Sequence, residues 1–173
     1  MPESRYGSFA IGLQAAYLNR YRQDPLLGTP REPAREYAGH FTTPASPIPG
    51  ANFTRWRALA TLDWNRGAWH AQWRTRYVGK FTVGYANRPL QESACLFDSP
   101  AGCALKIGAT TYHDLSAGYS YEPLNARVDV GIDNAFDKQP PVLYLNNAPN
   151  ANTDVATFDT VGRFFWARVS LKF

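Results

Sequence analysis

The feature that most constrains this chain is the strict alternation of its last segment, Val161-Gly-Arg-Phe-Phe-Trp-Ala-Arg-Val-Ser-Leu-Lys-Phe173. Apolar residues stand at every second position from Phe165 onward, and the residues between them become increasingly polar, ending with Arg168, Ser170 and Lys172. Because side chains two apart in a strand lie on one face, the pattern predicts a strand with one apolar and one polar face. The alternation is too regular for a helix.

Five earlier segments alternate in the same way, which predicts an all-β chain. The six predicted strands fall near 8–23, 53–65, 68–83, 111–121, 125–136 and 161–173. Two connections are short, whereas the other three, 24–52, 84–110 and 137–160, are long and hold 11 of the 13 prolines. Proline cannot donate to a strand ladder, so these stretches are predicted loops. Long loops alternating with short turns are unusual in a compact soluble domain and typical of outer-membrane barrels.

The short connections predict how the strands pair. A two-residue loop in each would place Trp64 opposite Trp69 and Tyr121 opposite Ala126, with both apolar rows of each hairpin on one face. Trp56 and Trp64 bracket the apolar row of the second segment, a spacing of about 21 Å along the normal of a tilted strand. They are predicted to form two aromatic girdles, with all five tryptophans at lipid-facing positions or loop rims.

Composition narrows the function classes. The 173 residues carry 18 basic and 14 acidic side chains without a run of like charges, which argues against nucleic-acid binding. No apolar run reaches the 18 residues that a transmembrane helix needs, and the first residues lack the apolar region of a signal peptide. The histidines His40, His70 and His113 lack metal-ligand spacing and are expected to be solvated or hydrogen-bonded. We therefore expect no catalytic residues, no metal and no cofactor.

Several segments carry a family resemblance that covers essentially the whole chain. Asp133-Asn-Ala-Phe-Asp-Lys-Gln-Pro-Pro141 and the later Thr157-Phe-Asp-Thr-Val-Gly-Arg163 resemble the segments around the last extracellular loop of TonB-dependent receptors. Tyr17-Leu-Asn-Arg-Tyr21, Leu62-Asp-Trp-Asn-Arg-Gly-Ala-Trp69 and Arg74-Thr-Arg-Tyr-Val-Gly79 resemble their late strands. The Phe-Asp-Lys and Gly-Arg segments are specific together, whereas the tyrosine patterns alone are weak.

The resemblance implies a fold and a role. These receptors close a barrel of about 22 strands around a plug domain, and the plug and the segment that contacts TonB lie N-terminal to the barrel. Nothing here matches either, so residues 1–173 are expected to be the C-terminal portion of such a barrel. The fold expected is an antiparallel up-and-down meander of about six strands within a transmembrane β-barrel.

The resemblance also implies location, function and partners. The implied location is the outer membrane, and the implied function is active uptake of a scarce ligand such as a siderophore, a vitamin or a carbohydrate. The partners would be outer-membrane lipid, the preceding strands and plug, the barrel-assembly machinery, and TonB through the N-terminal part. In this class the terminal strand is the assembly signal, which implicates Phe173, Leu171, Val169 and Phe165.

Two further groups of residues are candidate sites. Arg55, Arg57, Arg74 and Arg76 would face the barrel lumen, with Arg57 opposite Arg76. Like charges placed directly opposite need an anion between them, either a plug carboxylate or an acidic ligand. Asp114 and Asp133, opposed in the other hairpin, could also supply the balance, or both sets could simply be solvated.

Cys95 and Cys103 lie in the middle long loop and are expected to form a disulfide if that loop is extracellular. Two other functions remain open: a small autonomous outer-membrane barrel acting as a pore or an adhesin, and a soluble β-sandwich binding module. A signal peptide directly before Met1 would favour the former, and a soluble monodisperse monomer the latter.

Overall fold

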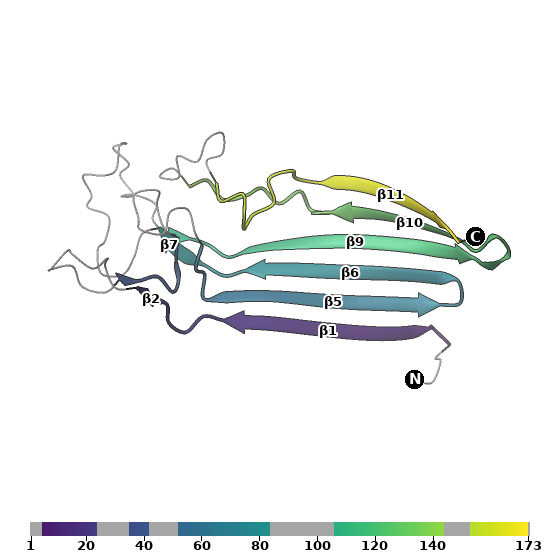
Figure 1. The fold of residues 1–173 in the computed structure, drawn as a ribbon, viewed down its shortest axis with the longest axis horizontal. Helices are drawn as coiled ribbons and strands as arrows, with labels where there is room; N and C mark the ends of the chain where they lie inside the picture. The colour runs from purple at the N-terminus through teal and green to yellow at the C-terminus, as the bar shows by residue number, and fades with distance from the viewer. Residues whose placement is uncertain (1–4, 24–34, 42–51, 84–105, 144–152, 173) are drawn as a thin grey trace.

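Six long strands form one antiparallel sheet in the computed structural model of the chain, which describes residues 5–23, 35–41, 52–83, 106–143 and 153–172 (Figure 1). The strands are β1 (Ser8–Tyr17), β5 (Trp56–Arg66), β6 (Trp69–Val78), β9 (Thr110–Tyr121), β10 (Ala126–Asp133) and β11 (Phe164–Leu171). They lie side by side in chain order, which confirms the predicted all-β, up-and-down meander. Among the described residues the sheet is not closed into a barrel, because β1 and β11 occupy its opposite edges.

The two short connections lie at one end of the sheet (Figure 1). A single 3-10 turn, η2 (Glu122–Leu124), joins β9 to β10 and ends at Asn125, whose φ of 45° is left-handed. Tyr121 pairs with Ala126 as predicted. The register predicted for the other hairpin was wrong by two positions.

In that hairpin Trp64 pairs with Ala71 and Trp69 pairs with Arg66. The two-residue loop consists of Gly67 and Ala68 rather than Arg66 and Gly67. Gly67 has a φ of +54°, and two-residue hairpin loops favour glycine at such a position because it has no Cβ to clash. A shift of two preserves which face each side chain occupies, so the predicted faces hold although the predicted partners do not.

Five short strands lie at the other end of the sheet, within or next to the predicted long loops. They are β2 (Arg22–Gln23), β3 (Arg35–Glu36), β4 (His40–Phe41), β7 (Phe81–Val83) and β8 (Lys106–Ile107), and they form a two-stranded and a three-stranded sheet. The predicted strands 8–23 and 68–83 are therefore each broken in two. The second break falls at Gly79, where a Cβ would stand 2.9 Å from the carbonyl oxygen of Trp56.

The two faces of the long sheet differ in composition and in coverage. One face carries the apolar rows, and Ile11 and Leu13 on it are 81% and 75% exposed. Other large apolar residues at least one-third exposed on this face include Phe9, Trp56, Trp69, Trp73, Val130, Phe165 and Val169. In the described part of the chain, nothing packs over this apolar face as the second layer of a sandwich would.

The buried hydrophobic core lies elsewhere, where the loops meet the end of the sheet. Phe41, Phe81, Phe158 and Leu143 pack with Val78 and Tyr112, which occupy polar-face positions of β6 and β9. Short segments at the loop end therefore bury their own apolar side chains against the polar face. The described residues include no helix long and apolar enough to cross a membrane.

Candidate functional site on the polar face

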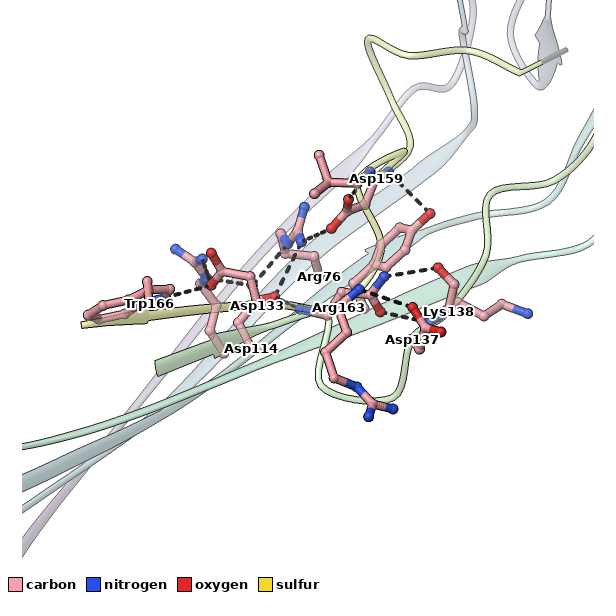
Figure 2. Close-up of polar contacts among 12 residues, drawn as sticks. Arg76, Asp114, Asp133, Asp137, Lys138, Asp159, Arg163 and Trp166 are labelled. Carbon is pink, nitrogen blue, oxygen red and sulfur yellow. Dashed lines mark hydrogen bonds and ion pairs between the residues drawn. The ribbon is translucent and has the colours of Figure 1, made fainter. Parts of the chain in front are cut away.

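A carboxylate at the centre of the polar face organises the candidate site. Asp114 projects from β9 and is only 5% exposed, and two guanidinium groups from the neighbouring strand converge on it (Figure 2). Arg74 Nε donates to Asp114 Oδ2 at 2.9 Å, and Arg76 Nε donates to the same oxygen at 3.1 Å. The other oxygen, Oδ1, accepts from the main-chain N–H of Asn134 at 2.9 Å. Such charge-assisted bonds are stronger than neutral ones.

The geometry follows from strand pairing. Arg74 pairs directly with Asp114 across β6 and β9, and Arg76 stands two residues along β6 on the same face. Both arginines therefore reach one carboxylate, which lies between them. The sequence left open whether these carboxylates balance the arginines or are separately solvated, and the structure shows Asp114 paired with both arginines. The predicted opposition of Arg57 and Arg76 was wrong, since Arg57 pairs with Val78 and Arg76 with Leu59.

Further carboxylates complete the cluster around the two arginines. Asp133 Oδ1 lies 3.9 Å from Arg74 and accepts a hydrogen bond of 3.4 Å from the indole N–H of Trp166. Asp159, from the segment returning towards β11, lies 3.7 Å from Arg76. The Arg76 guanidinium also lies 5.1 Å from the ring centre of Tyr112. The cluster thus joins the loop end of the chain to the sheet wall.

The loop after β10 is held by its own polar contacts. The side chain of Asn134 donates to the carbonyl of Lys138 at 3.0 Å and accepts from its N–H at 2.8 Å. Asp137 Oδ1 accepts from the N–H of Arg163 at 3.0 Å, which fastens this turn to the start of β11 (Figure 2). Asn134 and Asp137 both have positive φ, which asparagine and aspartate tolerate better than most residues. The Asp-Asn-Ala-Phe-Asp-Lys motif therefore encodes a turn with defined contacts.

The other two predicted arginines lie apart from this cluster. The Arg55 guanidinium donates to the carbonyls of Leu18 and Asn19, and Arg57 donates to the carbonyl of Asn52 at 3.0 Å. These contacts tie segments at the loop end together. Of the four arginines proposed as one ligand-binding group, the structure brings together only Arg74 and Arg76.

A second cluster lies nearer the short turns. His70 Nε2 lies 2.6 Å from Asp129 Oδ1, and Arg127 donates to both oxygens of Asp129 at 2.9–3.0 Å. His70 rests on Gly118, where a Cβ would stand 2.3 Å from its ring. The cluster was not singled out from the sequence, although its residues alternate on the polar rows of their strands. The expectation that the histidines are hydrogen-bonded polar residues is confirmed for His70.

The two remaining histidines also have partners. His40 Nδ1 lies 3.1 Å from the carbonyl of Ala38. The ring of His113, on the apolar face, receives the Trp73 indole N–H at 3.2 Å and has the Thr75 hydroxyl at 3.1 Å. The described residues contain no group of three or more His, Cys, Asp and Glu side chains that could hold a metal ion.

Three of the four residues of the predicted assembly signal lie in the described part of the terminal strand. Phe165, Val169 and Leu171 lie exposed on the apolar face as the alternation requires. Trp166 lies on the opposite, polar face, two residues after the start of β11, so only the other four tryptophans occupy apolar-face positions. Phe173, Cys95 and Cys103 lie outside the described residues, and their proposed roles stay predictions.

The described part of the polar face therefore carries arginine and histidine side chains paired with carboxylates. Arg74, Arg76 and Arg127 are each neutralised by a nearby carboxylate, and the opposite face of the sheet is apolar. No protein-family model matches the chain, and no similar protein was found among curated sequences or solved structures.

Proposed function

We propose that the chain forms the C-terminal wall of an outer-membrane β-barrel of the TonB-dependent receptor class, which takes up a scarce ligand. The observation that carries the proposal is the exposed apolar face of the six-stranded sheet. A soluble protein rarely leaves so large a contiguous apolar surface uncovered. Lipid would cover this face, and water or an inner domain would contact the paired charges on the other.

The distribution of aromatic residues along the apolar face supports this proposal. The ring centres of Tyr17 and Trp56 lie 4.7 Å apart near the loop end. Those of Trp69 and Tyr119 lie 4.8 Å apart near the short turns. Aromatic pairs at both ends of an apolar band are typical of the two membrane interfaces. Between them, the small residues Ala71 and Ala117 pair across β6 and β9. They leave an apolar hollow, bordered by Trp64, Trp73 and Phe165, that suits an acyl chain.

The sheet edges support membership of a larger barrel over a small autonomous one. β1 and β11 each pair on one side only among the described residues, and unpaired backbone is not tolerated in hydrocarbon. Six strands also fall short of the eight that close the smallest barrels. Further strands would satisfy both edges. The resemblance of the Asp133–Pro141 and Thr157–Arg163 segments to late receptor segments is what favours TonB-dependent uptake over another barrel function.

Brominated-lipid quenching of tryptophan fluorescence tests the membrane orientation. Two single-tryptophan variants, one keeping Trp73 and the other Trp166 with the remaining four replaced by phenylalanine, place the probe on opposite faces. After reconstitution into liposomes, Trp73 fluorescence should be strongly quenched by brominated acyl chains and Trp166 much less. Equal quenching of both, or of neither, would refute the assignment of faces.

The transport proposal needs a separate measurement. Deleting residues 1–173 from the intact receptor should abolish energy-dependent ligand accumulation, whereas Asp63→Ala, at an exposed polar-face contact, should leave it unchanged. Candidate siderophores, vitamins and carbohydrates would be compared as labelled substrates. Uptake of all candidates that does not depend on TonB would favour a passive pore instead.

A further inference from the structure

Strand β11 forms one edge of the sheet and carries Arg168 on its polar face, with Lys172 directly after the strand. On one side it pairs with β10 along its whole length, from Phe164 opposite Asp133 to Leu171 opposite Ala126. On its other side, no described strand pairs with it. Its outward backbone groups are therefore available to an additional strand.

Inside the sheet, several cationic side chains on the polar face are bonded to a carboxylate, whereas Arg57 on β5 contacts only the carbonyl of Asn52. Arg74 is bonded to Asp114 on the next strand, and His70 to Asp129 two strands away across Gly118. Arg127 is bonded to Asp129 on its own strand. Opposite charges at neighbouring sheet positions stabilise pairing, and like charges weaken it.

The two cations at this edge, Arg168 on β11 and Lys172 directly after the strand, differ from Arg74, Arg76 and Arg127, which are bonded to carboxylates. Arg168 stands opposite Asp129, but the oxygens of Asp129 are bonded to Arg127 and His70. The Arg168 guanidinium instead lies 5.8 Å from the ring of Trp166. The main-chain N–H of Lys172 continues the strand ladder by donating to the carbonyl of Asn125 at 3.1 Å. Within the described part of the chain, neither Arg168 nor Lys172 forms an ion pair with a carboxylate.

The opposite edge of this sheet could not supply the missing charge. The polar face of β1 consists of Ser8, Ala10, Gly12, Gln14 and Ala16. None of these residues is acidic. A second copy of the chain that docked its β1 against β11 would match apolar face to apolar face but leave Arg168 and Lys172 unneutralised.

We propose that β11 is completed by a separate extended segment that carries apolar side chains on one face and carboxylates on the other, opposite Arg168 and Lys172. The inference rests on the proposed function, because the segment would be the next strand of the same barrel wall. Its apolar face continues the lipid-facing row of Phe165, Val169 and Leu171. Its carboxylates supply the neutralisation that Arg74, Arg76 and Arg127 already have.

Peptide pairing tests the proposal on the full chain refolded in detergent micelles. Three peptides of about ten residues, the length of a barrel strand, alternate valine with glutamate, with glutamine or with lysine. Fluorescence anisotropy of labelled peptide should give about tenfold tighter binding for the glutamate peptide than for the lysine peptide. A zero-length carbodiimide reaction, which joins an amine to a carboxylate, should cross-link the glutamate peptide to Lys172, as located by mass spectrometry.

Charge reversal provides the matched control. The double variant Arg168→Glu/Lys172→Glu should invert the preference towards the lysine peptide. Arg57→Glu, on the same face of interior strand β5, should leave the preference unchanged. Equal binding of all three peptides, an unchanged preference in the double variant, or cross-linking only at Lys80, Lys106 or Lys138 would overturn the proposal.

The lipid-quenching experiment reports separately on the proposed function. Quenching of Trp73 with no peptide preference would refute the acidic partner strand and leave the membrane assignment standing. A retained peptide preference without quenching would refute the membrane assignment alone.

Discussion

The indole ring of Trp166 fills the space that a side chain at Gly131 would occupy on the neighbouring strand. An added Cβ would stand 2.4 Å from the Cε2 and Cζ2 atoms of the ring, too close for any real contact. The two residues pair directly across β10 and β11. The ring also donates to Asp133, so the absence of a side chain at Gly131 helps to place Trp166 beside the arginine cluster.

Gly131→Ala should therefore displace the ring and destabilise the hairpin, by about 1–3 kcal/mol as expected for overpacking. Gly108→Ala is the matched control, because a Cβ there would meet nothing within 4 Å and its φ is not positive. Denaturant unfolding in micelles, followed by tryptophan fluorescence in the variant that keeps only Trp166, measures both changes. Equal midpoints for the two variants would contradict this account.

Asp114→Ala should weaken the attachment of the loop end to the sheet. The change leaves Arg74, Arg76 and the Asn134 N–H without their shared acceptor, and removing one partner of a buried ion pair is costly. Because the arginines are partly exposed, we expect a loss of about 2 kcal/mol in the free energy of unfolding.

Asp63→Ala removes an exposed contact to Gln72 and should cost well under about 1 kcal/mol, which makes it the control for Asp114→Ala. Chemical unfolding of both variants in the same detergent gives the comparison. Equal losses would mean that Asp114 does not organise the cluster.

Acidification should loosen the small sheet of β2 and β3. Burial alone would raise the pKa of Glu36, but its carboxylate accepts from the N–H groups of Tyr21 and Ala38, and Arg20 and Arg55 lie near, so the pKa is lowered overall. A carboxyl group with a lowered pKa in the folded state stabilises that state above its ordinary pKa. This stabilisation is lost as the pH falls through the lowered folded value.

Near-ultraviolet circular dichroism can follow this loss, because Tyr21 stacks on Phe53 at 4.7 Å beside Glu36. The aromatic signal should fade below about pH 4, near the ordinary carboxyl value. Glu36→Gln should show a weaker signal at neutral pH and a smaller change on acidification. An identical titration of the variant and the unchanged chain would exclude Glu36 as the cause.

If the proposed function is correct, removal of Phe173 from the intact protein should lower its level in the outer membrane. The reason is the proposed role of the terminal aromatic residue in the assembly signal. Ser170→Ala, on the polar face of the same strand, should have little effect on assembly. Quantitative immunoblotting of outer-membrane fractions compares the two, and undiminished levels of the deletion variant would count against the assembly signal.

Cys95 and Cys103 should be joined in protein isolated from an oxidising compartment. Mass spectrometry of unreduced tryptic peptides should find the two cysteines linked. Complete alkylation of both thiols without a reductant would show that they are free.

The long strands could be predicted from the sequence because each has one apolar and one polar face, which requires apolar and polar residues to alternate. Phe165, Val169 and Leu171 could not alternate with polar residues in any other regular structure. The β9–β10 register was predicted correctly, with Tyr121 opposite Ala126. The β5–β6 register was not, because either placement of Gly67 in a two-residue loop preserves the faces.

The polar cluster could be predicted only in part. Strand alternation placed Arg74, Arg76 and Asp114 on one face, and the pairing brought them together. Asp159 lies outside the long strands, so its approach to Arg76 depends on the path of a loop, which alternation does not specify. The contact of Trp166 with Gly131 could not be predicted, because strand alternation gives the face of the ring but not the direction in which it turns.

The hydrophobic core at the loop end implies that two parts of this structure respond differently to the surrounding solvent. Phe41, Phe81, Phe158 and Leu143 bury their surface against one another and hold the loops whatever surrounds the sheet. The apolar face, by contrast, is exposed, and under the proposed function lipid or detergent covers it. A change of detergent should therefore alter amide hydrogen exchange along β1 and β11 while leaving the most protected amides at the loop end almost untouched.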